Sequence, residues 1–261
     1  MKNYIYMAAG LFNVETNMVN AYFTKQLEAF YAKNPLTKRG EEIQAKCYLP
    51  QRDGFEVGKI ADFISHAGHI LPPDGKLTAA EVVMYVPYYL DLGYFMSNSI
   101  AVVANLDEPI DNGLMVEIAY AKLCNIPVIG LRTDLRTPLG ERTNILSINP
   151  FIIEQCDCFI WSQTPPGDFD DVMSHTDSII TELEKRIRKW VADDSKSNEM
   201  RESQNPIFKN IIKGSDLLFS DLEGNIHTDE NMTKIVKSFA KHAEFLMEIA
   251  PELVPIGTPG E

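Results

Sequence analysis

The chain has 261 residues, 45% of them apolar and 10% aromatic, which is enough for one large domain or for one domain with an extension. Its net charge of −13 and its pI near 4.9 argue against a protein that binds nucleic acid or an anionic membrane surface. No apolar run approaches the roughly 20 residues of a membrane span, and the first residues lead into a strand instead of a signal peptide, so the expected location is cytoplasmic.

The N-terminal part of the chain alternates apolar strand patterns with a helical pattern. It predicts a strand over 4–9, a helix over 13–34 and a second strand over 45–49. Residues 51–76 are rich in glycine and proline, so we expect a long loop there, of the kind that forms lids or binding loops. A helix then begins at the capping-box sequence of Thr78 and Glu81. It runs toward Phe95, and Pro87 predicts a kink within it.

The same alternation continues after that helix. The pattern predicts strands over 99–104, 127–131 and 158–161, a helix through Glu117 to about 125, a polar loop over 133–144, a short helix near Pro150 and an amphipathic helix over 170–191. Short apolar strands that alternate with helices are typical of parallel sheets with helices on both faces. We therefore predict an α/β fold with a doubly wound parallel sheet of five strands.

The composition changes after Asp193, which divides the chain into two predicted parts. Residues 1–193 form the α/β domain, and residues 194–261 form a C-terminal extension that is partly helical. The extension begins with a polar linker, has helical periodicity over 232–249 and ends in a tail of prolines and glycines. Its apolar content exceeds that of a disordered tail, so we expect it to pack on the domain or on a neighbouring subunit.

Acidic residues follow the strand predicted over 99–104. Asp107, Glu108 and Asp111 come directly after it, and Glu117 lies on the next helix. Open α/β sheets bind their ligands at the carboxyl ends of the strands, which is where these groups should lie. The simpler interpretation makes Asp111 a helix cap and Glu117 a solvated surface charge. Glu117, however, stands among apolar neighbours, and a buried carboxylate is costly unless it has a function.

Other motifs give weaker signals. No G-x-G-x-x-G or P-loop sequence follows the first strand, which argues against dinucleotide and nucleoside triphosphate binding. His66 and His69 have the spacing of two metal ligands, but no third ligand is in view, and we expect no metal. Asp107, Glu108 and Asp111 could hold Mg²⁺ as in a signalling receiver domain, although their spacing is not specific. The four scattered cysteines are expected to be free thiols.

Four separated segments resemble one enzyme family in their residues, order and spacing. They are Tyr4-Ile5-Tyr6-Met7-Ala8-Ala9-Gly10-Leu11-Phe12, the single Asp91, Asp107-Glu108-Pro109-Ile110-Asp111-Asn112-Gly113 with Glu117-Ile118-Ala119-Tyr120-Ala121, and Asn144-Ile145-Leu146-Ser147. They are similar to the nucleoside 2-deoxyribosyltransferases, and the resemblance covers roughly residues 4–162. Ile118-Ala119 departs from the family's usual Leu/Ile-Gly, and the residues after Asp193 have no counterpart in it.

The resemblance implies a flavodoxin-like fold and a double displacement in which Glu117 attacks the anomeric carbon of a 2′-deoxynucleoside. Asp91 and Asp111 would supply a proton or hydrogen bond to the departing base. Tyr6 would hydrogen-bond Glu117 and hold its orientation. The residues that the resemblance places around the substrate are Gly10, Phe12, Gln51 and, from a neighbouring subunit, Asn144.

The resemblance implies that the substrates are deoxynucleosides and free nucleobases, and that no cofactor, metal, nucleic acid or membrane takes part. It also implies a homo-oligomer, either a dimer or a multiple of dimers. One alternative is an N-glycosidase that hydrolyses nucleoside 5′-monophosphates with the same nucleophile. It needs a phosphate cradle, and the turn after the first strand has no serine or arginine, although Arg132, Arg136 and Arg142 could supply charge. A second alternative is a non-catalytic nucleotide-sensing module that binds a partner through the C-terminal extension.

Overall fold

The computed structural model describes residues 3–10, 14–56, 58–73, 75, 77–133, 148–162, 167–193 and 196–248. Its centre is a five-stranded sheet in the order β4-β1-β5-β6-β7, with every neighbouring pair parallel. The strands are β1 (Tyr4–Ala8), β4 (Lys46–Tyr48), β5 (Ser99–Asn105), β6 (Val128–Arg132) and β7 (Cys158–Trp161). This is the strand order of flavodoxin-like folds, and it confirms the predicted doubly wound parallel sheet.

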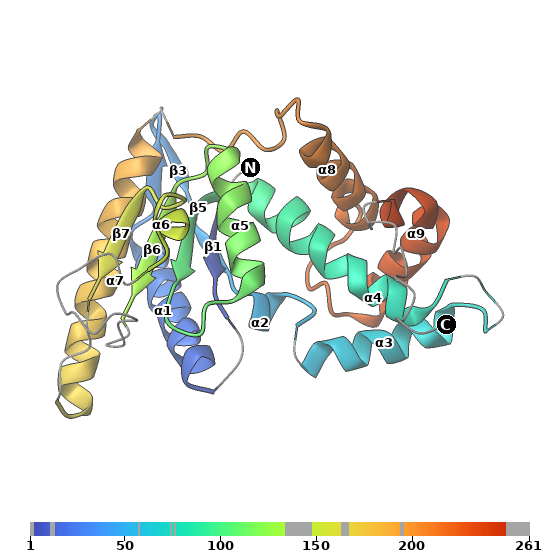
Figure 1. The fold of residues 1–261 in the computed structure, drawn as a ribbon, viewed down its shortest axis with the longest axis horizontal. Helices are drawn as coiled ribbons and strands as arrows, with labels where there is room; N and C mark the ends of the chain where they lie inside the picture. The colour runs from blue at the N-terminus through green and yellow to red at the C-terminus, as the bar shows by residue number, and fades with distance from the viewer. Residues whose placement is uncertain are drawn as a thin grey trace, which may run out of the picture.

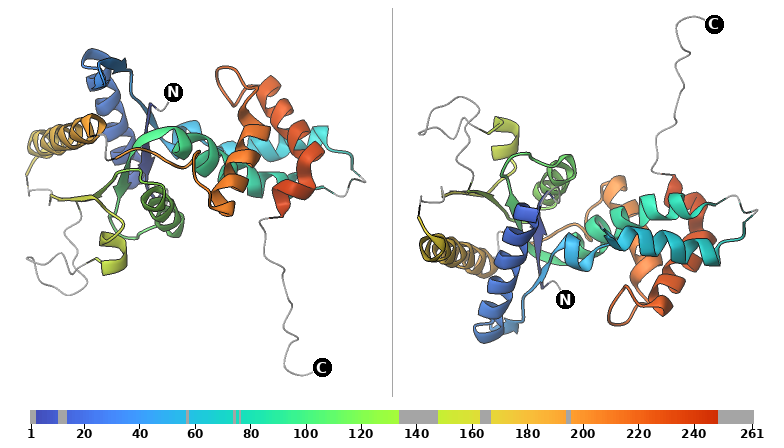
Figure 2. Two further views of the ribbon diagram at one scale, coloured as in Figure 1. Left: turned by 90° about the horizontal axis from the view of Figure 1, so that it is seen from above. Right: turned by 90° about the horizontal axis from the view of Figure 1, so that it is seen from below.

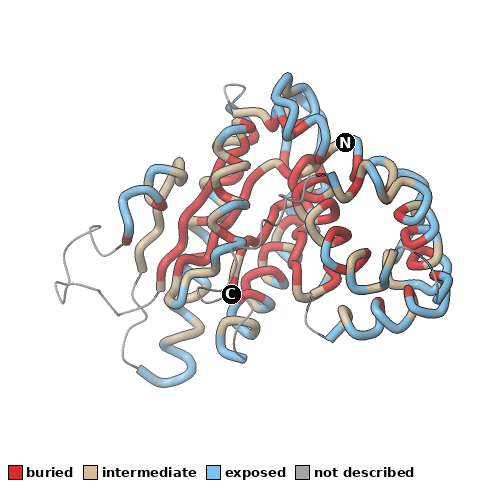
Figure 3. Tube along the Cα trace, turned by 45° about the vertical axis from the view of Figure 1, so that its right-hand side comes forward, coloured by how far each residue is buried: buried red, intermediate tan, exposed pale blue. Residues whose placement is uncertain are grey.

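Helices cover both faces of the sheet (Figure 1). On one face, side chains such as Ile5 and Met7 pack against α1 (Val14–Lys33) and α7 (Phe169–Ala192). On the other face, Tyr6 and Ala8 belong to a second core, which includes residues of α4 (Ala79–Tyr88), α5 (Asn112–Leu123) and α6 (Pro150–Ile153). Successive strand side chains point to opposite faces, so a strand buried on both sides reads as a continuous apolar run. Figure 3 shows this burial along the sheet.

The prediction of a long loop over 51–76 is wrong. This segment contains the last three residues of the short helix α2 (Pro50–Asp53) and all of α3 (Gly58–Ile70). Phe63 and Ala67, four residues apart on α3, are buried where this helix packs on α4 and α9. Glycines and prolines flank the helix on both sides, which made the local pattern resemble a loop. The sequence pattern also did not predict an antiparallel hairpin, which β2 (Leu36–Lys38) forms with β3 (Glu41–Ile43).

The helix predicted from Thr78 toward Phe95 has two parts. Its start is confirmed, because Thr78 and Glu81 form both hydrogen bonds of a capping box. After α4, the chain continues as a π-helix, η1 (Tyr89–Phe95), and then as a short 3₁₀ turn, η2 (Met96–Asn98). Pro87 lies just before this change and lacks the N–H that an α-helix needs at that position. The kink therefore takes the form of a change in helix type.

The C-terminal helices are α8 (Pro206–Phe219) and α9 (Asp229–Met247). The helix α8 packs along η1, and α9 packs against both α3 and α8. Apolar residues of both helices, among them Phe208 and Phe239, belong to the same core as Tyr6. Figures 1 and 2 show α3, α8 and α9 as a helical group beside the sheet, and α4 runs from this group toward the sheet. Across the described residues, no helix is long and apolar enough to span a membrane.

Candidate active site

Two tyrosines and two carboxyl groups meet where the chain connections of the sheet change direction. Strand β1 lies between β4 and β5, and its crossover to β4 and the return to β5 run over opposite faces of the sheet. Ligands of open α/β sheets bind at such a switch point. Tyr6 on β1 is in register with Tyr48 at the end of β4, and their ring centroids lie 5.1 Å apart. Both side chains point to the face that η1 and α5 cover.

Glu117 lies on the second turn of α5 and faces β1. The phenol of Tyr6 donates a hydrogen bond to Glu117 Oε1 over 2.8 Å. Burial raises the pKa of Glu117 to about 7, and the nearby charges of Asp111 and Glu56 act in the same direction, while the Tyr6 hydrogen bond opposes them. The positive end of the α5 dipole favours the ionised form of Glu117. Desolvation outweighs that effect because the group is enclosed.

Asp91 is carried by the π-helical turn η1. Tyr48 donates a hydrogen bond to Asp91 Oδ1. Burial and the neighbouring charge of Glu117 hold the pKa of Asp91 well above its usual range, although the Tyr48 hydrogen bond acts against them. Asp91 therefore retains its proton where an ordinary aspartate is ionised, and a protonated carboxyl group can donate a hydrogen bond or transfer a proton. The structure thus places two carboxyl groups together, each held by one buried tyrosine.

Asp111 is the N-cap residue of α5. Its Oδ1 accepts a hydrogen bond from the backbone N–H of Gly113 over 2.6 Å, which is the simpler role considered from the sequence. Its charge is nevertheless close enough to Glu117 to raise the pKa of that group. Asp111 is therefore a helix cap at the rim of the carboxyl cluster.

Glu56 and Tyr48 belong to this site, although sequence reasoning missed both. Glu56 follows α2 in the segment that was predicted as a loop, and its own pKa is raised by burial and by the charge of Asp111. Its charge also raises the pKa of Asp91 and of Glu117. No local signal distinguishes Glu56 from other surface glutamates. Tyr48 could have been found by pairing the two predicted strands in parallel, which brings it beside Tyr6.

Of the other residues predicted to surround the substrate, the structure describes two and leaves two out. Gly10 is buried just beyond β1. Gln51 is on α2, where its Nε2 donates to the backbone carbonyl of Asn17 over 2.8 Å. Its Oε1 is buried and has no hydrogen-bond partner in the part of the chain that the structure describes. Phe12 and Asn144 lie outside the described residues.

The candidate metal ligands have other contacts. His66 Nε2 lies 3.0 Å from Thr233 Oγ1, and His69 Nδ1 lies 2.6 Å from the carbonyl of Ser65. Asp107 accepts hydrogen bonds from the backbone and hydroxyl of Thr133. Within the described ranges, no group of three or more His, Cys, Asp or Glu side chains could hold a metal ion.

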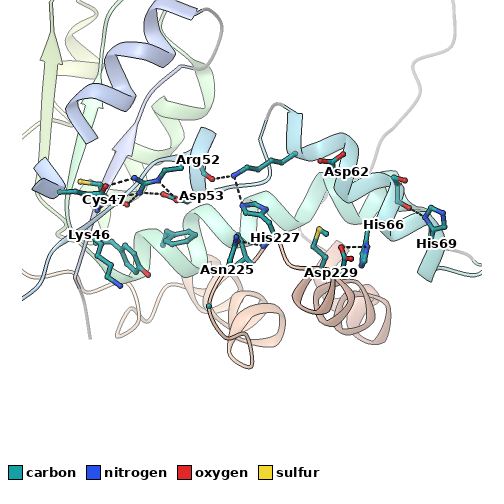
Figure 4. A pocket seen from close by; sticks show the side chains of 18 residues that line it. Lys46, Cys47, Arg52, Asp53, Asp62, His66, His69, Asn225, His227 and Asp229 are labelled. Carbon is teal, nitrogen blue, oxygen red and sulfur yellow. Dashed lines mark hydrogen bonds and ion pairs between the residues drawn. The ribbon is translucent and has the colours of Figure 1, made fainter. Parts of the chain in front are cut away.

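A pocket of about 1050 Å³ lies at the β4 edge of the sheet, and neither Glu117 nor Asp91 lines it (Figure 4). Here Arg52 bridges two carboxylates, with contacts of 2.9 Å to Glu28 and 2.8 Å to Asp53. Phe95 lines this pocket and stacks on Tyr48 at 3.7 Å between ring centroids. The Tyr48–Phe95 layer therefore separates the pocket from the two carboxyl groups.

Comparisons with known proteins give little more. No family model and no curated protein matches the chain. Among solved structures, the crystal structure of a conserved protein from Enterococcus faecalis V583 is similar, with 20% sequence identity and a TM-score of 0.41. The similarity covers 71% of this chain and 99% of that one.

Proposed function

We propose that the protein transfers 2-deoxyribose from a 2′-deoxynucleoside to a free purine or pyrimidine base. The observation that carries this proposal is the pair of tyrosine-held carboxyl groups at the switch point, Glu117 with Tyr6 and Asp91 with Tyr48. Displacement at a sugar carbon needs one ionised carboxylate as nucleophile and one protonated group as acid. Two neighbouring carboxyl groups with raised pKa values can divide these roles, because ionisation of one disfavours ionisation of the other.

In the first step, Glu117 attacks C1′ of the deoxynucleoside. The bond between C1′ and the base nitrogen breaks, its electron pair stays on the base, and Asp91 donates a proton to the base. The product is a deoxyribosyl ester of Glu117. In the second step, a nitrogen of another base attacks C1′, its proton passes to Asp91, and the ester bond breaks to restore the Glu117 carboxylate.

Tyr6 and Tyr48 orient these groups during the cycle. The Tyr6 hydroxyl holds one oxygen of Glu117 and leaves the other available for attack. Its hydrogen bond is stronger to a carboxylate than to a neutral ester, so it also favours release of Glu117 in the second step. The transition state resembles an oxocarbenium ion, which the negative charge of Glu117 stabilises. The proposed reaction uses no cofactor and no metal.

In this proposal the protein acts as a homo-oligomer in which Asn144 of a neighbouring subunit completes the sugar site. The glycosidase alternative requires free cationic groups for a 5′-phosphate. Arg132 does not serve that purpose well, because its side chain is buried and lies 3.6 Å from Glu108. Arg136 and Arg142, the other arginines considered for this role, lie outside the described residues. Among the described groups, the two tyrosine-held carboxyl groups support transfer of the sugar to a base.

One experiment separates these functions. The purified protein is incubated with deoxyinosine or thymidine, with and without free adenine, and the products are resolved by chromatography. Transfer predicts deoxyadenosine as product and less free deoxyribose when adenine is present. With deoxynucleoside alone, the peptide that contains Glu117 should gain the mass of one deoxyribosyl group, and the Glu117→Gln variant should not.

Sugar release at the same rate with and without adenine, together with a preference for 5′-monophosphates, would favour the glycosidase. Binding of nucleotides without any turnover would favour the sensing module. An adduct on a different peptide would contradict the assignment of Glu117.

A further inference from the structure

The C-terminal extension packs unusually closely against η1, the segment that carries Asp91. A Cβ atom placed on Gly214 of α8 would lie 2.1 Å from the Tyr89 ring of η1. A Cβ atom on Gly93 of η1 would lie 2.4 Å from Ser215 Cβ and 2.9 Å from the carbonyl oxygen of Ile211, both on α8. Each helix therefore contributes a glycine where the other approaches it, and any larger residue must move the two helices apart.

The second C-terminal helix also holds η1. The hydroxyl of Tyr89 donates a buried hydrogen bond over 3.0 Å to the carbonyl oxygen of Leu246 on α9. Asp91 lies between the two residues that make these contacts, Tyr89 and Gly93. A π-helical turn has weaker internal restraints than an α-helix and often occurs at functional sites. Its geometry here depends on what packs against it.

The side of η1 that is turned away from α8 faces the candidate active site. Tyr48 donates a hydrogen bond to Asp91, and the ring of Tyr48 stacks on Phe95, the last residue of η1. The turn is thus enclosed by β4 on one side and by α8 and α9 on the other. Phe208 of α8 also packs edge-on against Tyr120 of α5, with ring centroids 5.3 Å apart. The extension therefore touches both elements that carry the proposed catalytic carboxyl groups.

We propose that α8 and α9 form a positioning element for Asp91, in which the contacts of Gly214 and Leu246 with Tyr89 hold the π-helical turn against Tyr48. This inference rests on the proposed function, because it assigns Asp91 the role of the acid. It gives the C-terminal extension, which has no counterpart in the family that the catalytic segments resemble, a defined part in the reaction.

The test introduces Gly214→Ala and measures kcat/KM for sugar transfer between pH 5 and 9. The methyl group should push Tyr89 and η1 away from α8 and loosen the enclosure of Asp91. We expect kcat/KM to fall by about 10- to 100-fold, as for small displacements of a catalytic group. Burial is the main cause of the raised pKa of Asp91, so water entering the loosened turn should lower it, and the basic limb of the profile should move to lower pH.

Two controls separate positioning from general effects. Gly68→Ala makes the same exchange on α3, where no atom outside the adjoining part of that helix lies within 4 Å of the new methyl group. Ile187→Ala removes a buried side chain of α7 on the opposite face of the sheet and destabilises the fold without touching η1. Both variants should keep the wild-type pH profile at temperatures where they are folded. Tyr89→Phe, which removes only the hydrogen bond to Leu246, should shift the basic limb in the same direction as Gly214→Ala, by a smaller amount.

A direct titration keeps this inference separate from the proposed function. Carboxyl ¹³C resonances of aspartate are followed with pH, and the Asp91 signal is assigned from its loss in Asp91→Asn. If the wild type transfers no sugar, the proposed function fails, but a lower pKa of Asp91 in Gly214→Ala than in Gly68→Ala still supports positioning. An unchanged pKa and an unchanged pH profile in folded Gly214→Ala would overturn it. If Gly214→Ala does not fold, an unchanged Asp91 pKa in Tyr89→Phe overturns it instead.

Discussion

Two polar regions of this molecule differ in how their charges are balanced. At the β4 edge, Arg52 lies between Glu28 and Asp53, so the large pocket there contains charges that already neutralise one another. At the switch point, Glu117 and Asp91 are stabilised by two tyrosine hydroxyls, and no described cation lies within ion-pair distance of either. Opposite charges keep carboxyl groups ionised, whereas burial and like charges hold their protons.

The difference shows that the pocket and the carboxyl cluster are separate features with different charge balance. In the pocket, Arg52, Glu28 and Asp53 pair with one another, and these ion pairs account for their positions. The carboxyl groups at the switch point keep raised pKa values that nothing structural requires, which is typical of sites that do chemistry. The following predictions test this contrast, beginning with the largest expected effect.

The first prediction compares one residue from each region. Glu117→Gln should lower transfer by about 10⁴-fold or more, because it removes the nucleophile but keeps the shape of the side chain. Arg52→Met should leave the transfer rate within about threefold of wild type and lower the melting temperature slightly, since the Arg52 ion pairs are partly exposed. Steady-state rates and thermal melts of both variants check this. Equal losses of activity would remove the distinction between the regions.

The second prediction concerns the acid. Asp91→Asn should lower kcat/KM by about 10²-fold, the usual contribution of a general acid. The wild-type profile should be bell-shaped, with an acid limb near pH 7 from Glu117 and a basic limb from Asp91. The variant should lose the basic limb only. Substrates whose base leaves readily without a proton should be affected less, and a uniform loss across substrates would argue against an acid role.

The third prediction concerns Tyr6, whose hydrogen bond favours the ionised form of Glu117. Tyr6→Phe should lower kcat by about 10-fold, in line with a hydrogen bond to a charged group. Without this donor the pKa of Glu117 should rise further, so the acid limb should move to higher pH. Tyr31→Phe is the matched control, because Tyr31 is also buried but lies in the core on the other face of the sheet. Its profile should equal that of wild type.

The last prediction concerns stability. The pKa of Glu117 is raised from 4.5 to about 7 in the folded protein, so its contribution to stability is fully present below pH 4.5 and is lost as the pH rises through 7. Glu117→Gln should therefore become more stable than wild type across this interval, by about 3 kcal/mol at most. Urea unfolding at pH 4.5, 6 and 8 measures the difference. A stability difference that does not grow with pH would mean that Glu117 is not desolvated.

The sequence by itself determined the elements whose signals are local. The apolar runs that became β1, β5 and β6 are visible without a structure, because strands buried on both faces are apolar along their length. The capping box at Thr78 and the terminal helices are likewise set by neighbouring residues. The sequence places Glu117 on a helix after an apolar strand, and the family resemblance makes it the expected nucleophile.

Tertiary structure decided the features that depend on distant partners. The helix α3 is stabilised by packing against α4 and α9, which outweighs the glycines in and around it. Strand register brings Tyr48 beside Tyr6, and the fold brings Glu56 near Glu117, although none of these pairs is close in sequence. The raised pKa values follow from this enclosure, since desolvation depends on every atom around a group and not on its neighbours along the chain.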